Sequence, residues 1–257
     1  MTTVHHLYSE NRSSGTPTDF TVNWRCPSGH NRISLLMAQI PRSFYGVIQG
    51  HNTFSLGPML FTIPPGNYNV DTCLTTLNGL ISGVCFQPIT FNRKTGKYTI
   101  YTYADSMTFP ASSRLQPLFG FPDGTTTVST DPSGQITSSQ VVNLSGLSTV
   151  YVTTNLVHSG LGDGYDNTLA TIFVNNSVDF SNVIYQNTQV DRTALPLVSS
   201  KDNTLQNYDI NVKILDEYGS SVDTNGQDVR LVVLTWRQDD LFPLLKSYIE
   251  VRLNEIS

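Results

Sequence analysis

The sequence predicts an all-β fold, and three observations support this prediction. Several segments alternate apolar and polar side chains with a period of two, which is typical of strands with one covered face. Strands and helices do not alternate regularly, which argues against a parallel α/β sheet. Charged residues make up only 14% of the 257 residues, and abundant Thr, Asn, Gly and Tyr suit strands joined by ordered loops. We expect a single jelly roll of two packed antiparallel four-stranded sheets, with one or two short helices in the loops.

The two clearest strands lie near the end of the sequence. Segment 208–214 alternates apolar and polar residues, whereas segment 229–236 is apolar on both faces, as in a strand covered on both sides. The connection between them is rich in Asp, Asn and Gly and is too long for a two-residue hairpin. The two strands therefore either pair antiparallel or lie in different sheets.

The remaining elements follow in chain order. A helix should begin after Asn69 or Asp71, either of which can cap it, and Gly83 can end it in the left-handed conformation. A hairpin with Gly96 in its turn is expected after the helix, and segment 112–118 is a short helical candidate. The other expected strands are 19–24, 32–40, 59–63, 84–91, 98–103, one or two within 141–155, 169–174, 183–185 and 195–198.

The chain shows no internal repeat and no low-complexity linker, so we expect one domain over residues 19–257 with long insertions. Residues 1–18 are polar and are expected to form a flexible N-terminal arm. Residues 241–257 form a C-terminal tail whose pattern fits either a helix covering the domain's own core or a strand. Assembly contacts are expected in both terminal segments, at His5, His6, Tyr8, Leu241, Phe242, Leu244, Leu245 and Tyr248.

Nothing in the sequence points to catalysis or to a cofactor, and we expect no enzymatic activity. The five histidines have no metal-ligand spacing, and neither a nucleophile elbow nor a phosphate-binding loop occurs. Asp163 and Asp166 could supply oxygens to calcium, but Asp and Gly are ordinary loop residues, and we prefer a plain turn. Aromatic residues such as Trp24, Tyr103 and Trp236 could line a sugar-binding face but are more often part of a core.

The charge and the cysteines limit the setting of the protein. A net charge of −5 argues against direct nucleic-acid binding, which needs a basic face. No apolar stretch approaches the length that a membrane span requires, and the N-terminus lacks the apolar run of a signal peptide. Three cysteines without metal-ligand spacing are expected to be free thiols in a reducing compartment.

The order of several short motifs between residues 32 and 236 carries more information than any one of them. The motifs are Ile40-Pro41-Arg42-Ser43-Phe44-Tyr45 leading to Asn52-Thr53-Phe54, Ile63-Pro64-Pro65-Gly66-Asn67-Tyr68 before the helix, the hairpin from Ile89 to Ile100, Leu118-Phe119-Gly120-Phe121, and Leu215-Asp216-Glu217-Tyr218-Gly219 followed by Asp223-Thr224-Asn225-Gly226. This series resembles the penton, or minor capsid, proteins of virophages and polinton-like viruses, in the adenovirus-related double jelly-roll lineage of double-stranded DNA viruses.

The resemblance implies a structural protein of the virion with a single jelly roll. Five copies would form a homopentamer that plugs the icosahedral vertex and contacts the surrounding major capsid protein trimers. A vertex fibre or an internal minor capsid protein is a further possible partner. Two alternatives remain open: a spike or fibre-type protein of the same lineage, and a receptor- or glycan-binding jelly-roll protein of a virion. Calcium-dependent glycan binding would distinguish a jelly-roll lectin.

Overall fold

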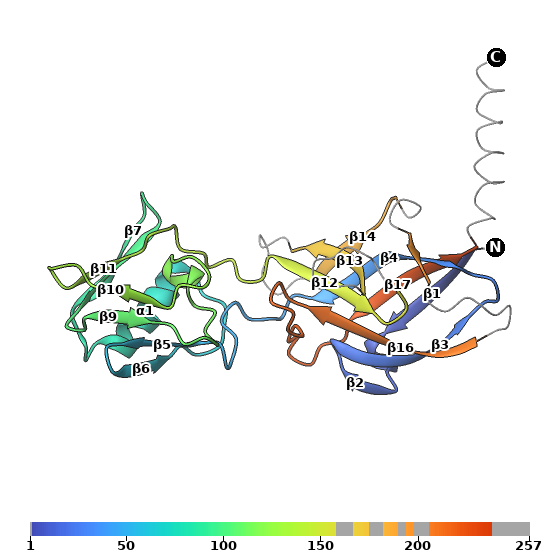
Figure 1. Cartoon of the computed structure of the whole chain (residues 1–257), viewed down its shortest axis with the longest axis horizontal. Coiled ribbons are helices and arrows are strands. Elements are labelled where there is room, and N and C mark those ends of the chain that lie inside the picture. Colours follow the sequence, from blue (N-terminus) through green and yellow to red (C-terminus); the bar gives the residue numbers. More distant parts are fainter. Residues whose placement is uncertain (1, 158–166, 175–181, 190–193, 198–205, 238–257) are drawn as a thin grey trace, which may run out of the picture. The chain divides into compact units, whose positions relative to one another are not determined.

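The computed structural model describes residues 2–157, 167–174, 182–189, 194–197 and 206–237. The chain divides into two compact units (Figure 1). Both ends of the chain, Met1–Phe44 and Leu147–Ser257, belong to one unit, and Tyr45–Gly146 forms the other. Each unit has its own hydrophobic core, so each is described by itself.

The unit formed by the two ends of the chain is built from two antiparallel sheets. One sheet has the strand order β1-β17-β4-β14, with β15 beside β4, and the other has the order β13-β12-β16-β3-β2. The strands are β1 (Thr2–Tyr8), β2 (Ser14–Thr16), β3 (Asp19–Cys26), β4 (Arg32–Pro41), β12 (Thr149–Thr154), β13 (Thr168–Phe173), β14 (Asn182–Gln186), β15 (Leu195–Pro196), β16 (Gln206–Leu215) and β17 (Arg230–Trp236).

This strand order is that of a jelly roll, which confirms the predicted fold class. Without the short strands β2 and β15, each sheet has four strands, and the chain passes repeatedly from one sheet to the other. The last strand, β17, lies between β1 and β4 in one sheet, whereas β16 lies between β12 and β3 in the other. The sequence left open whether these two strands pair with each other or lie in different sheets, and the structure shows that they lie in different sheets. We call this unit the jelly-roll unit.

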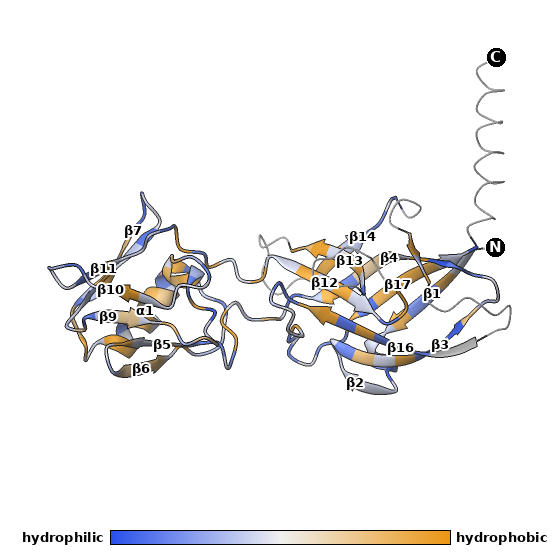
Figure 2. Ribbon diagram, viewed as in Figure 1, coloured by the Kyte–Doolittle hydropathy of each residue, from blue (hydrophilic) through white to orange (hydrophobic). Residues whose placement is uncertain are grey.

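The core of the jelly-roll unit lies between its two sheets. Alternate residues of β3 and β16 are buried, and the central strand β17 is buried along most of its length, as its sequence predicts. Figure 2 shows this alternation as neighbouring apolar and polar segments along the strands. The inward-facing residues include Phe20, Val22, Trp24, Val150, Val152, Ile210, Val212, Ile214, Leu231 and Val233.

The second unit is inserted between β4 and β12, and we call it the insertion unit. It contains a sheet with the order β10-β9-β5-β6 and a sheet with the order β11-β8-β7. Its elements are β5 (Thr53–Leu56), β6 (Met59–Thr62), α1 (Val70–Ile81), β7 (Cys85–Asn92), β8 (Lys97–Thr102), β9 (Ser106–Thr108), η2 (Pro117–Phe119), β10 (Thr127–Ser129) and β11 (Gln135–Thr137).

Helix α1 begins where the sequence predicts. The Asn69 side chain accepts a hydrogen bond from the backbone N–H of Thr72 (2.8 Å), and the Thr72 hydroxyl accepts one from the backbone of Asn69 (3.0 Å), which forms a capping box. The helix buries Cys73, Leu77 and Ile81, which share one face. It does not end in a left-handed glycine: Ser82 is the right-handed C-cap, and Gly83 does not have a positive φ.

The insertion unit begins and ends at one place. A Cβ atom built on Gly46 would lie 3.3 Å from the Cα of Gly146, and one built on Gly146 would lie 3.1 Å from the Cα of Gly46. Gly146 also has a φ of +70°, which favours glycine. The chain therefore enters and leaves this unit through two closely packed glycines, an arrangement that is typical of an inserted domain.

The structure differs from the expected domain organisation in two ways. Residues 1–18 contain strands β1 and β2 rather than a loose arm, because β1 pairs with β17 and buries Leu7. One domain over residues 19–257 was expected, but residues 45–146 have a separate core. Strands β5, β9, β10 and β11 were not among the expected strands, and each has only three or four residues, too few to show a clear alternating pattern.

Candidate assembly surface

Strand β1 places three of the expected contact residues, His5, His6 and Tyr8, on one strand. It is the outer strand of its sheet and pairs with β17 over its whole length, from Thr2 opposite Trp236 to Tyr8 opposite Arg230. His5 faces the same side as the buried Leu7, whereas His6 faces solvent. The far edge of β1 has no neighbouring strand among the described residues, and an unpaired strand edge is a template on which another chain can pair.

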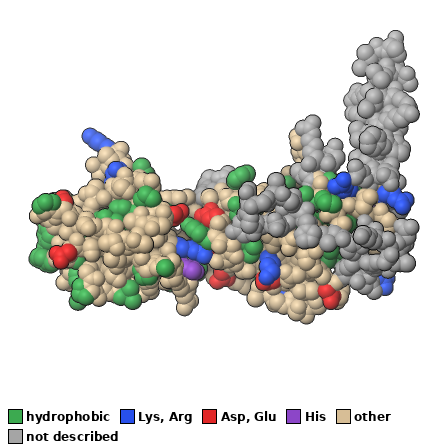
Figure 3. Space-filling model, viewed as in Figure 1, with side chains coloured by type: hydrophobic (Ala, Val, Ile, Leu, Met, Phe, Trp, Pro, Cys, Tyr) green, Lys and Arg blue, Asp and Glu red, His purple; other side chains and the backbone are tan. Residues whose placement is uncertain are grey.

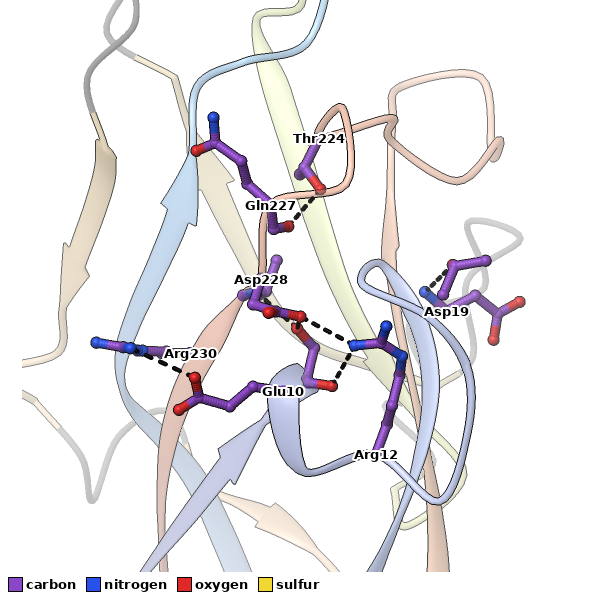
Figure 4. Close-up of polar contacts among 10 residues, drawn as sticks. Glu10, Arg12, Asp19, Thr224, Gln227, Asp228 and Arg230 are labelled. Atoms are coloured by element: carbon purple, nitrogen blue, oxygen red, sulfur yellow. Dashed lines mark hydrogen bonds and ion pairs between the residues drawn. The ribbon is translucent and has the colours of Figure 1, made fainter.

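A buried serine, Ser9, anchors the end of β1 to the beginning of β17, at the junction where Figure 4 shows Arg12 beside Asp228. The Ser9 hydroxyl donates to Oδ1 of Asp228 (2.8 Å) and accepts from the backbone N–H of Val229 (2.8 Å). The Ser9 backbone N–H donates to the carbonyl of Val229 (2.9 Å). Arg12 Nη1 donates both to the Ser9 carbonyl (2.7 Å) and to Asp228 Oδ1 (2.9 Å). Ser9 is fully buried, so these contacts hold the N-terminal segment in the fold.

A polar patch lies on the outer side of the same junction. The Arg230 guanidinium lies 3.6 Å from the Glu10 carboxylate and 5.7 Å from the centre of the Tyr8 ring. The Tyr8 hydroxyl and His6 Nδ1 are 2.8 Å apart. These groups are partly or fully exposed, so each contact contributes little to stability. They form a polar surface with an aromatic ring and an arginine, two side-chain types that are enriched in protein interfaces.

Two histidines share one buried hydroxyl beneath this strand. Thr235 Oγ1 lies 2.9 Å from His5 Nε2 and 2.8 Å from His30 Nδ1, and the His5 ring meets the edge of Trp24 at 4.9 Å. Burial above all, and then the neighbouring His30 and His6, lower the pKa of His5 from its ordinary value of 6.5 to about 4. A hydroxyl has a single proton, so it can donate to only one of the two rings. Burial and the neighbouring imidazoles, rather than the hydroxyl, disfavour the charged form of His5, so acid should weaken this arrangement.

The opposite edges of the sheets expose large apolar side chains. Phe173 on β13 is 81% exposed, and Ile184 on β14 is 65% exposed. Each strand is the outer strand of its sheet in the described residues. Their neighbours Ile172 and Val183 are buried, and adjacent residues of a strand face opposite sides. An apolar residue directly beside a buried one in the same strand is therefore the sequence signal for these exposed positions.

The chain can now be compared with known proteins. No family model matches the chain, and no curated protein sequence matches it. The solved structures that match include the mavirus penton protein. The match covers 92% of this chain and 99% of that chain, with 11% sequence identity and a TM-score of 0.47. Mavirus is a virophage, so the matched structure comes from the class of viruses whose penton proteins the sequence motifs resemble.

The other expected site residues have different outcomes. The calcium candidates Asp163 and Asp166 lie outside the described residues, as do the tail residues Leu241, Phe242, Leu244, Leu245 and Tyr248. Among the described residues, no group of three or more His, Cys, Asp or Glu side chains is placed to hold a metal ion. In the same part of the chain, no helix is long and apolar enough to span a membrane.

The cysteines and the aromatic residues can be compared with expectation directly. All three cysteines are free, as predicted, and burial raises the pKa of the Cys26 thiol to about 11. Trp24 and Trp236 are core residues, in line with the preferred interpretation. Tyr103 is not, because it is 76% exposed.

Proposed function

We propose that this protein is a penton protein, the structural protein that occupies the five-fold vertices of an icosahedral virion. Five copies would close a ring and contact the surrounding major capsid protein. The observation that carries the proposal is the jelly-roll strand order of the unit formed by the two chain ends, since this fold is used widely in viral capsids. The sequence motifs between residues 32 and 236 support the same role.

The surface of the jelly-roll unit is suited to ring closure. A closed ring uses a head-to-tail interface, so each subunit needs two different complementary faces. The β1 edge offers polar and aromatic groups, whereas β13 and β14 offer the exposed Phe173 and Ile184. Charged residues make up only 14% of the chain, and Figure 3 shows them scattered over the visible face rather than gathered in one patch; a low charge reduces the desolvation cost of association.

The setting of this role is also proposed. The protein would be located at the capsid vertex and would assemble inside the host cell, where its three free cysteines would remain reduced. A vertex fibre or an internal minor capsid protein would be an additional partner.

The native mass of the purified full-length protein tests the proposal. Light scattering on a sizing column should give five times the chain mass of 28.4 kDa, or about 142 kDa. Phe173→Glu or Ile184→Glu should shift the protein toward monomer, because either change places a charge in the proposed interface. Asp105→Ala, an exposed change in the insertion unit, serves as the control. A trimer would contradict the penton role and favour a spike.

A further inference from the structure

Three aromatic side chains cluster on one outward face of the insertion unit, on the β11-β8-β7 sheet. The Phe86 ring centre lies 6.0 Å from that of Tyr101 and 5.3 Å from that of Tyr103. Phe86 is 39% exposed and Tyr103 is 76% exposed. A single exposed apolar side chain is common on protein surfaces, whereas a contiguous group of exposed apolar side chains points to a binding site.

The cluster has a fixed position on the sheet. A Cβ atom added to Gly134 would lie 3.2 Å from the Phe86 ring, so the ring packs closely on this glycine. The Gly134 carbonyl accepts a hydrogen bond from the Thr102 backbone (2.9 Å), and this bond holds the glycine beside the end of β8. Gly134 has a φ of +74°, a conformation that favours glycine. The Phe86 ring is therefore held against the sheet, and the Tyr101 and Tyr103 rings lie beside it.

Amide and hydroxyl side chains continue this face along the sheet. Tyr101 pairs with Gln87 on one side and with Gln135 on the other. Two residues earlier along β8, the next row of side chains on the same face consists of threonines: Thr99 lies between Thr90 of β7 and Thr137 of β11. The Thr99 and Thr137 hydroxyl oxygens are 3.4 Å apart. Two rows of groups that both donate and accept hydrogen bonds thus adjoin the aromatic rings.

The face carries almost no charge. Strands β7 and β11 contain no charged residue, and β8 contains only Lys97, at its beginning. The Lys97 ammonium donates to the carbonyl of Ser139 (2.9 Å). In the turn before β11, the Asp131 carboxylate accepts from the Ser133 hydroxyl (2.7 Å) and from the Gln135 backbone (2.9 Å). These contacts lower the pKa of Asp131 and engage its carboxylate within the turn.

We propose that this face binds a neutral glycan. The apolar side of a pyranose ring presents C–H groups with a partial positive charge, which stack on the negative face of an aromatic ring. The hydroxyl groups at the edge of a sugar both donate and accept hydrogen bonds, as do Gln and Thr side chains. Tyr103 and Phe86 would supply the stacking surface, and Gln87, Gln135 and Thr99 would supply the polar contacts.

The same observations disfavour other occupants. A sulfated or sialylated glycan needs a basic group, and the one basic side chain of these strands is already hydrogen bonded. A protein interface core is enriched in methionine and arginine as well as in aromatic residues, and strands β7, β8 and β11 contain neither methionine nor arginine. The aliphatic residues of these strands, Ile89, Ile100 and Ile136, are all buried in the core of the insertion unit. A neutral glycan matches the groups that this face exposes, which are aromatic rings beside uncharged Gln and Thr side chains.

Binding of the full-length protein to an array of oligosaccharides tests the proposal. The array carries neutral oligomers of hexoses and N-acetylhexosamines, together with sialylated and sulfated oligomers for comparison. The affinity for the neutral oligomers that bind is then measured by titration calorimetry. We expect binding to neutral oligomers, and we expect Tyr103→Ala to weaken it by about tenfold, which corresponds to one lost stacking contact.

Two further variants make the result specific. Tyr103→Phe keeps the ring and should bind within about threefold of the natural chain. Tyr218→Ala removes an aromatic side chain that is 45% exposed on the jelly-roll unit and should leave glycan affinity unchanged. Three outcomes would overturn the proposal: no binding to any neutral oligomer, binding that Tyr103→Ala leaves intact, or a native mass that Tyr103→Ala alters. The last outcome would show that the face contacts another protein subunit.

Discussion

The Ser9 hydroxyl joins the N-terminal segment to the beginning of β17, and its removal gives a sharp test of the structure. Ser9→Ala deletes both the hydrogen bond to Asp228 and the acceptor for the backbone N–H of Val229. Ser9 and Val229 are both fully buried. Water therefore cannot replace the lost acceptor without opening the end of β1.

The expected cost follows from what each partner loses. The Val229 N–H would remain buried without a partner, which costs about 1–3 kcal/mol. Asp228 keeps its contact with Arg12, and about 37% of its side chain is exposed, so water replaces the lost bond at a cost of about 0–1 kcal/mol. We therefore expect the free energy of unfolding to fall by about 2 kcal/mol. For a urea dependence of about 2 kcal/mol per molar, the midpoint would fall by about 1 M.

Tryptophan fluorescence during urea unfolding measures this change selectively. The protein contains two tryptophans, Trp24 and Trp236, and both are buried in the jelly-roll unit. The signal therefore reports only the unit that contains the substitution. The matched control is Ser13→Ala, an exposed serine whose loss should change the free energy by less than about 0.5 kcal/mol. Equal midpoints for the two variants would refute the role assigned to Ser9.

Three other predictions concern acid, the insertion unit and its core. The unfolded chain binds a proton at His5 near pH 6.5 and the folded chain only near pH 4, so the stability of the jelly-roll unit should fall as pH decreases through this range. His5→Gln should flatten this pH dependence in urea titrations, whereas His51→Gln should not. Residues 45–146 expressed alone should fold, because this unit has its own core and adjacent ends. The fragment should show one cooperative thermal transition by circular dichroism and dispersed amide resonances by NMR. The spectrum of an unfolded chain would contradict the prediction. Tyr98→Phe should change the free energy of unfolding of that fragment by less than about 1 kcal/mol. The buried Tyr98 hydroxyl has no well-formed hydrogen bond in the described structure and interacts with the Cys73 thiol, a weak hydrogen-bonding group. A larger loss of stability, measured by calorimetry, would show that the hydroxyl makes a stronger bond.

Local sequence patterns predict an element when it buries several residues at a regular spacing. Strands β16 and β17 each bury at least three residues, and helix α1 buries three residues at intervals of four after a recognisable cap. Strand β1 gives no such signal. Leu7 is its only buried residue, and Val4 faces outward at 49% exposure. The pairing of β1 with β17, more than 200 residues away in the chain, makes it a strand, and no local pattern contains that information.

The candidate surfaces show the same limit. The sequence identifies His5, His6 and Tyr8, but only the fold brings His30 and Thr235 to His5. The division into two units also has no local signal, because the chain crosses the boundary at Gly46 and Gly146 without a linker rich in glycine, serine or proline. Two glycines 100 residues apart have no visible relation until the insertion unit closes.

The place of the insertion accounts for how one chain can carry two proposed roles. A loop between two jelly-roll strands can hold a folded unit at little entropic cost when the ends of that unit meet, as they do at Gly46 and Gly146. The jelly-roll strands pack around a core that contains no residue of the inserted unit. The aromatic face around Tyr103 lies entirely within the insertion unit, so its side chains can change without altering either core. Assembly and recognition would therefore respond to different substitutions: Phe173→Glu should act on the native mass alone, and Tyr103→Ala on glycan affinity alone.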